Sequence, residues 1–185
     1  MRKTEERYKV LSYPVTVNTY GRGGEKPFII KEDRRISKGD SCNTSTLILP
    51  NHFGTHIDCP NHFYNSGKKI HEYKIKDFIF LKPIVLNCPK SADKLILEGD
   101  IKKDYRRLKG ADILLLRTGF YRYRGAYKYS THNPGIAPGA AEFIRSYLTN
   151  IKCVGIDSVS VSPYQNRKLG RETHRIFFKN SFRSE

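Results

Sequence analysis

The sequence has little of several features, and two of these shortages, in paired cysteines and in long apolar runs, exclude a class of protein. Tryptophan is absent, methionine occurs once, and 18 acidic residues stand against 34 basic ones. The four cysteines have no paired spacing, which argues against both a disulfide framework and a thiolate metal site. No run approaches the ~20 apolar residues that a membrane-spanning helix needs, and the charged N-terminus has no apolar region after it. We therefore expect a cytoplasmic protein that does not bind membranes.

The excess of basic residues gives a formal net charge of +16, which is the one extreme of the composition. A charge of this sign favours nucleic acid or another anionic surface as a partner, because neutralised phosphates release counterions. The basic residues, however, are dispersed in pairs such as Lys68-Lys69 and Arg106-Arg107, without a long basic block or a nucleic-acid-binding motif. We interpret them as a solvated surface that is compatible with anionic substrates, and nucleic acid is not the expected partner.

The length of the chain fits one domain over residues 1–185 with a single core. Residues 113–116 form a continuous apolar run that is typical of a buried strand. Pro138 then opens a helix at a favoured first-turn position, and a short apolar strand follows at 152–156. Strand, helix and strand in this order predict a parallel pair with a right-handed connection, in a mixed α/β domain. Asp157 follows at the strand's carboxyl end, where open α/β sheets usually bind ligands.

Three of the six histidines lie within one stretch, which reads His52-Phe53-Gly54-Thr55-His56-Ile57-Asp58-Cys59-Pro60-Asn61-His62-Phe63. If residues 52–58 are extended, His52, His56 and Asp58 point to one side. Two imidazoles and a carboxylate on one face are a usual ligand set for a catalytic divalent metal, because they leave positions open for water. Pro60 ends the predicted strand, and His62 follows close enough to reach back. The alternative, an ordinary strand with structural histidines, fits each of these residues alone better than it fits all of them at this spacing.

This stretch resembles the His-x-Gly-Thr-His-x-Asp-x-Pro-x-His signature of the putative cyclase family, whose best-known members are the bacterial kynurenine formamidases, metal-dependent amidohydrolases. Weaker segments follow in the family's order, namely residues 11–14, 111–119 and 154–158 and then His174. The resemblance covers nearly the whole chain. It implies a compact fold in which a central, barrel-like mixed β-sheet is flanked by helices.

The resemblance also implies metal-assisted hydrolysis of an amide, with an N-formylkynurenine-type compound as the first substrate to test. His52, His56 and Asp58 would hold one divalent ion, zinc or else manganese, which lowers the pKa of a bound water and polarises the carbonyl. By the same resemblance Asp58 would bridge to a second ion that His174 also ligates. His62 would be the general acid/base, because an imidazole titrates near neutral pH.

Two further expectations come from the family. Tyr20 lies in the glycine-rich loop 18–26 and is a candidate substrate contact, with an ordinary surface tyrosine as the alternative. A homodimer is expected, with the tyrosines and phenylalanine of residues 120–129 as the contact surface.

The C-terminus departs from the family pattern. Glu185 comes one residue short of the spacing that the family shows between His174 and a glutamate that bridges both metals, and no apolar strand precedes it. We therefore expect a weak or empty second metal site and slow or absent hydrolysis. The alternatives to an amide hydrolase are a metal-binding relative with little or no activity, and a basic nucleic-acid-binding module on the same scaffold.

Overall fold

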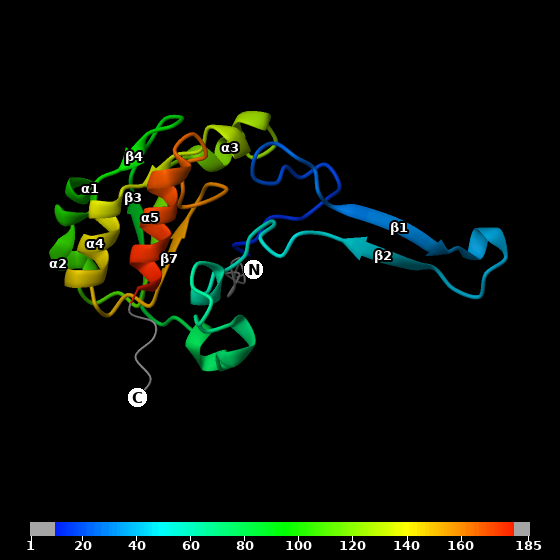
Figure 1. Ribbon diagram of the computed structural model, residues 1–185, viewed down its shortest axis with the longest axis horizontal. Helices are drawn as coiled ribbons and strands as arrows, with labels where there is room; N and C mark the ends of the chain where they lie inside the picture. Colours follow the sequence, from blue (N-terminus) through cyan, green and yellow to red (C-terminus); the bar gives the residue numbers. More distant parts are fainter. Residues whose placement is uncertain (1–9, 180–185) are drawn as a thin grey trace, which may run out of the picture. The chain divides into compact units, whose positions relative to one another are not determined.

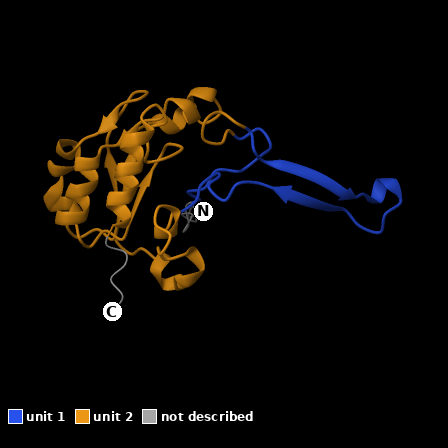
Figure 2. Ribbon diagram, viewed as in Figure 1, with its two compact units in different colours: residues 1–19, 26–57 blue, residues 20–25, 58–185 orange. Residues whose placement is uncertain are grey.

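The computed structural model describes residues 10–179, and the chain divides into two units (Figure 2). Unit 1 comprises Met1–Thr19 and Lys26–Ile57, and unit 2 comprises Tyr20–Glu25 and Asp58–Glu185. No helix within residues 10–179 is both long and apolar enough to cross a membrane. The expectation that residues 1–185 form one domain stays a prediction.

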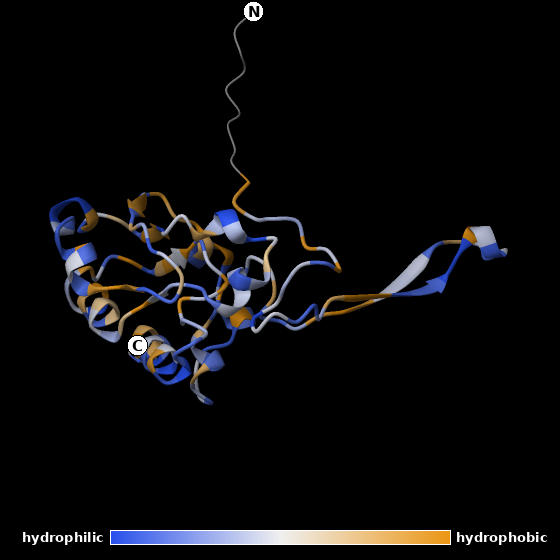
Figure 3. Cartoon of the chain, turned by 90° about the horizontal axis from the view of Figure 1, so that it is seen from above, coloured by the Kyte–Doolittle hydropathy of each residue, from blue (hydrophilic) through white to orange (hydrophobic). Residues whose placement is uncertain are grey.

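Unit 1 contains an antiparallel hairpin of β1 (Ile29–Arg34) and β2 (Thr44–Ile48), with the 3-10 turn η1 (Ile36–Lys38) at its tip (Figure 1). Two side chains fix the connection, since Asp40 accepts from the backbone N–H of Arg35 at 2.6 Å and Asn43 accepts from that of Ile36 at 2.9 Å. The pairs Ile29–Ile48 and Ile30–Leu47 lie at the base of the hairpin and the polar pairs lie nearer the tip (Figure 3). Because neighbouring pairs face opposite sides, both faces of the base are apolar.

Unit 2 is built on a parallel sheet of three strands in the order β3 (Pro83–Asn87), β5 (Ile113–Arg117) and β7 (Cys153–Ile156). β4 (Leu95–Ile96) and β6 (Gly135–Ile136) form a second, two-stranded parallel sheet. The helix α4 (Pro138–Tyr147) connects β5 and β7, as the sequence pattern predicts. The mixed α/β class is thereby confirmed, and the strands of residues 10–179 form three open sheets without a closed barrel.

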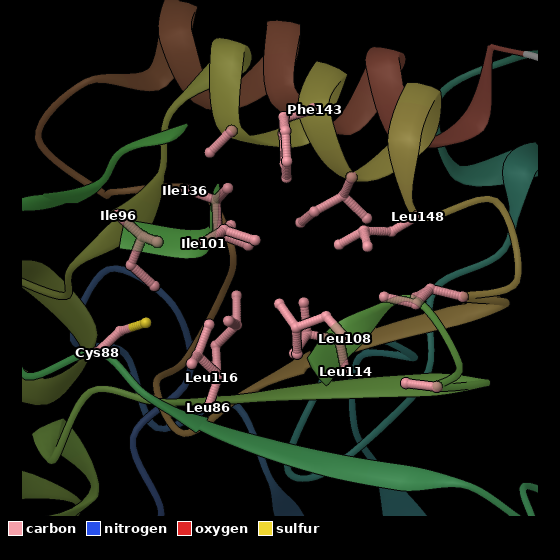
Figure 4. Packing of buried hydrophobic residues seen from close by; sticks show 14 residues of the cluster. Leu86, Cys88, Ile96, Ile101, Leu108, Leu114, Leu116, Ile136, Phe143 and Leu148 are labelled. Atoms are coloured by element: carbon pink, nitrogen blue, oxygen red, sulfur yellow. The ribbon is translucent and has the colours of Figure 1, made fainter. Parts of the chain in front are cut away.

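The helices of unit 2 are α1 (Glu98–Lys102), α2 (Tyr105–Leu108), α3 (Tyr127–Thr131), α4 and α5 (Arg167–Phe178). Short 3-10 turns lie at η2 (Pro60–His62), η3 (Ile70–Glu72), η4 (Ile75–Phe78) and η5 (Phe120–Tyr123). Helix α4 packs against both α1 and α5. The core lies between α4 and the parallel sheet, where Leu114, Leu116 and Ile144 are almost fully buried (Figure 4). Burial of such side chains contributes roughly 1.5–3 kcal/mol each.

Residues 120–129 are less exposed than the sequence pattern predicts. Phe120 and Tyr129 are 1% and 6% exposed, and their rings stack with centroids 6.2 Å apart. Tyr121 and Tyr127 remain exposed. The expectation of an exposed aromatic surface is therefore wrong for the two buried rings, because they complete the packing of η5 against α3.

Candidate metal centre

The segment 52–58 is not the strand that its alternation predicts. It consists of bends and coil, and Gly54 has a φ of +69°, in the left-handed region that other residues rarely adopt. A Cβ added at Gly54 would lie 2.7 Å from Cγ2 of Val15, so the backbone also approaches that side chain too closely for a larger residue. The residues that would form the inward face of such a strand are not all buried. Phe53 is buried, but Thr55 and Ile57 are exposed.

The turn at Gly54 nevertheless brings the expected groups together. The rings of His52 and His56 lie edge to face with centroids 5.2 Å apart. One ligand atom from each of His52, His56 and Asp58 lies within 4.8 Å of the others. Nδ1 of His56 is 3.0 Å from the carbonyl oxygen of Gly54. Because a carbonyl only accepts, this bond puts a proton on Nδ1, so Nε2 is the nitrogen of this ring that could ligate a cation.

The donor set fits a divalent metal. Two imidazole nitrogens and one carboxylate oxygen are the ligands of many catalytic zinc sites, whereas calcium and magnesium prefer oxygen alone. The three side chains come from one continuous stretch of seven residues, so the fit is a property of that stretch.

His174 is held in one orientation within unit 2. It lies on α5, is 4% exposed, and its Nδ1 is 2.9 Å from the carbonyl oxygen of Gly170 and 2.7 Å from Oγ of Ser162. The carbonyl can only accept, so Nδ1 carries a proton and Nε2 is the ring nitrogen that faces Asp58. That Nε2 lies 3.6 Å from Oδ2 of Asp58, and the ring stacks on Phe63 at 4.5 Å between centroids. Asp58 therefore faces His174 and is also a member of the three-residue cluster.

His62 lies at the end of η2, which begins at Pro60 as the sequence pattern predicts for a turn at this point. Its side chain is exposed. The His62 ring has its centroid 4.7 Å from that of Phe63 and 6.0 Å from that of His174. His62 is thus beside the Asp58–His174 pair and remains open to solvent.

The other expected site residues are Tyr20 and Glu185. Tyr20 is half-buried and its ring packs edge to face on Tyr127 at 6.1 Å between centroids. Glu185 lies outside the described residues. Asp157 accepts from the backbone N–H groups of Thr118 and Gly119 at 2.8 Å each, and so joins the loops that follow β5 and β7. Its place beside a ligand stays a prediction.

Sequence reasoning missed Ser162, whose hydroxyl contacts Nδ1 of His174. The signal that could have found it is Gly170, four residues before His174 in the helix. A Cβ added at Gly170 would lie 2.4 Å from Oγ of Ser162, so only glycine lets the serine reach the ring.

Two open hollows lie on other parts of unit 2. The larger, of about 780 Å³, is lined by α1, α2 and α4, and the smaller, of about 630 Å³, is lined by Tyr64 together with residues of α4 and α5. Neither hollow is lined by the histidines described above.

The chain is similar to known proteins in sequence and in structure. The profile of a family described as putative cyclase matches residues 10–163. A kynurenine formamidase of Bacillus cereus is 29% identical over 171 residues, which cover 90% of this chain and 75% of the relative. An uncharacterised protein of Haemophilus influenzae is 33% identical over 110 residues, which cover 58% of this chain and 78% of the relative.

Among solved structures, isatin hydrolase A from Labrenzia aggregata, bound to benzyl benzoate, superposes with a TM-score of 0.65 at 22% identity. The match covers 83% of this chain and 66% of the length of the hydrolase. At this level of identity the likeness shows a shared fold.

Proposed function

Because the chain belongs to the putative cyclase family, we propose that it is a metal-dependent hydrolase that cleaves an amide bond. The observation that carries this proposal is the convergence of ligand atoms from His52, His56 and Asp58 to within 4.8 Å inside the family's signature. The relatives named kynurenine formamidase support an amide as the substrate class.

His52, His56 and Asp58 would hold the first ion, with zinc or manganese as the metals that suit this donor set. Asp58 and His174 would hold a second ion between them, which is supported by the 3.6 Å between their facing atoms. When bound, the metal supplies a nucleophile at neutral pH and polarises the carbonyl of the substrate.

His62 would transfer the proton. Its support is geometric, because the ring is exposed and yet lies beside the rings of Phe63 and His174. An imidazole at this place can take a proton at a ring nitrogen and return it to the leaving amine.

Tyr20 stays a candidate contact for the substrate, and a cytoplasmic location stays a prediction.

We also propose a homodimer. Every residue of β1 and β2 is exposed, and within the described part of unit 1 no third strand or helix covers the hairpin. A two-stranded hairpin alone is marginally stable in water. Its apolar base, made by Ile29, Ile30, Leu47 and Ile48, therefore supports contact with a second copy of the chain.

The test is release of formate from an N-formyl aromatic amine such as N-formylkynurenine. We expect slow hydrolysis by the purified protein, loss of it after chelation, and recovery on addition of zinc or manganese. Hydrolysis that is insensitive to chelation would contradict the proposal, and no hydrolysis by the metal-loaded protein would favour the metal-binding relative with little or no activity. Binding of a polynucleotide that weakens steeply with salt would favour the nucleic-acid alternative instead.

A further inference from the structure

Three arginines of unit 2 lie on two segments, Arg22 on the loop 20–25 and Arg167 and Arg171 on α5, which also carries His174. Arg167 donates from Nη2 to the hydroxyl of Tyr164 at 3.0 Å, and its guanidinium carbon lies 4.8 Å from the centroid of that ring. Gly23 packs on the same hydroxyl, since a Cβ added to Gly23 would lie 3.2 Å from the hydroxyl oxygen of Tyr164. Tyr164 thus joins the loop that carries Arg22 to the first turn of α5, which carries Arg167.

Helix geometry adds the third arginine. Arg167, Arg171 and His174 follow one another at intervals of four and three residues, so they lie along one face of α5. His174 ends this row, with Nε2 3.6 Å from the carboxylate of Asp58. The two arginines therefore lie on the same helix face as the histidine of the candidate metal centre.

Electrostatics agree with this placement. Arg22 is exposed as a whole residue, yet burial around its guanidinium lowers its pKa, and the neighbouring charges of Arg167 and Arg171 lower it further. Tyr164 and Asp58 act in the opposite direction and raise the pKa. Arg22 is therefore within electrostatic reach of both other arginines and of Asp58.

The carboxylate of Asp58 acts on Arg22 electrostatically, without a direct ion pair among the described residues. No carboxylate within residues 10–179 forms an ion pair with Arg22, Arg167 or Arg171. Neighbouring positive charges repel, and partial burial strengthens the repulsion because it lowers the local dielectric constant. An anion placed among them would relieve that repulsion and could accept bidentate hydrogen bonds from planar guanidinium groups.

Other basic residues of α5 are arranged differently. Lys168 and Arg175 line the hollow of about 630 Å³ together with the carboxylates of Glu142 and Glu172. Arg171 borders this hollow as well and stands between the two surfaces. The row of Arg167, Arg171 and His174 thus lies beside this mixed-charge surface, about 100° round the same helix.

We propose that Arg22, Arg167 and Arg171 form an anion subsite that binds a carboxylate of the amide substrate beside the bond to be cleaved. This inference rests on the proposed hydrolase function. It assigns the substrate to the class of N-acylated amines that carry a carboxylate. Three of the chain's basic residues would then have a role in binding.

The test compares two N-formyl amines that differ in charge, 2-formamidobenzoate and neutral formanilide. In the wild-type protein kcat/KM should be higher for the anion. The variants Arg22→Gln, Arg167→Gln and Arg171→Gln should lower the ratio of the two kcat/KM values by about tenfold or more, mainly through KM, as loss of a charge-assisted hydrogen bond does. Lys168→Gln is the matched control on α5 and should leave the ratio unchanged. An unchanged ratio in all three variants would overturn the proposal.

A binding measurement separates this proposal from the proposed function. Titration with the fluorescent amine 2-aminobenzoate, and with aniline as the neutral probe, needs no turnover. If formanilide is cleaved but arginine substitution leaves binding of 2-aminobenzoate intact, the anion subsite is wrong and the hydrolase stands. If neither amide is cleaved and binding still falls in the arginine variants, the hydrolase is wrong and the subsite stands.

Discussion

Gly54 shows how one residue sets the geometry of the candidate metal centre. Its positive φ turns the chain between His52 and His56, so that two rings four residues apart face each other. A side chain at this position would cost about 1–2 kcal/mol in the left-handed conformation, and here it would also collide with Val15.

Gly54→Ala should therefore lower the free energy of unfolding by about 1–2 kcal/mol or more and should lower the metal content, because the two imidazoles separate. The control is Gly139→Ala in α4, where an added Cβ meets nothing within 4 Å, and this variant should be neutral or slightly more stable. Thermal unfolding with and without metal measures both effects. If the two variants had the same free energy of unfolding and the same metal content, this role of Gly54 would be wrong.

The variant His62→Ala tests proton transfer. It should keep its metal and lose on the order of 10²-fold or more in turnover, the usual contribution of a general acid/base. His132→Ala is a suitable control, because His132 is an exposed histidine that contacts Asp93 at 2.9 Å. Turnover that survives in His62→Ala would show that another group moves the proton.

For single residues, the sequence predicts which side chains lie together better than it predicts the backbone conformation that brings them together. The spacing of His52, His56 and Asp58 identifies the cluster, but a turn forms it and not the alternation of a strand. Gly170 signals that a neighbour comes close to α5 before His174, but that this neighbour is Ser162 depends on segments that only the folded chain brings together.

Among the elements, α1 is tied to the rest of unit 2 by its carboxylate Asp100. This side chain accepts from the backbone N–H of Leu97 at 2.8 Å and pairs with Lys90 at 2.7 Å. Burial raises the pKa of Asp100, but the hydrogen bonds from Lys90 and Leu97 outweigh it and hold the pKa below its ordinary value of 3.8.

A lowered folded pKa means that this pair stabilises the protein fully above pH 3.8 and progressively less as the pH falls through the folded value. Lys90→Met should lower the free energy of unfolding at pH 7 by about 1 kcal/mol. The difference from wild type should shrink in acid. Lys102→Met removes the more exposed Lys102–Glu98 pair and should have almost no effect. Denaturant unfolding at several pH values measures both, and a pH-independent difference for Lys90→Met would contradict the account.

The elements that sequence patterns predicted are those whose signal is local. The apolar run of β5, the proline that begins α4 and the short strand β7 all appear where expected. The strand expected over residues 52–58 does not form, because Gly54 has a positive φ that interrupts an extended backbone. The alternation of apolar and polar residues gives no information on the sign of φ. The open sheets could not be inferred either, since strand order depends on long-range pairing.

For the molecule as a whole, the apolar hairpin base predicts self-association. Replacing Leu47 and Ile48 together by Glu should convert a dimer into a monomer, because charge would replace apolar contact on both faces of the hairpin. Thr46→Glu, in the polar part of β2, is the control and should stay dimeric. Sedimentation at micromolar concentration measures the mass, and a monomeric wild-type protein would refute the dimer.

The central claim is that His52, His56 and Asp58 hold a divalent metal, and elemental analysis of purified protein tests it most directly. Wild-type protein and the control His71→Ala, which replaces an exposed histidine outside the cluster, should both retain bound zinc or manganese after desalting. His56→Ala should lose most of it, because one of the three converging ligands is gone. Undiminished metal in His56→Ala would contradict the account.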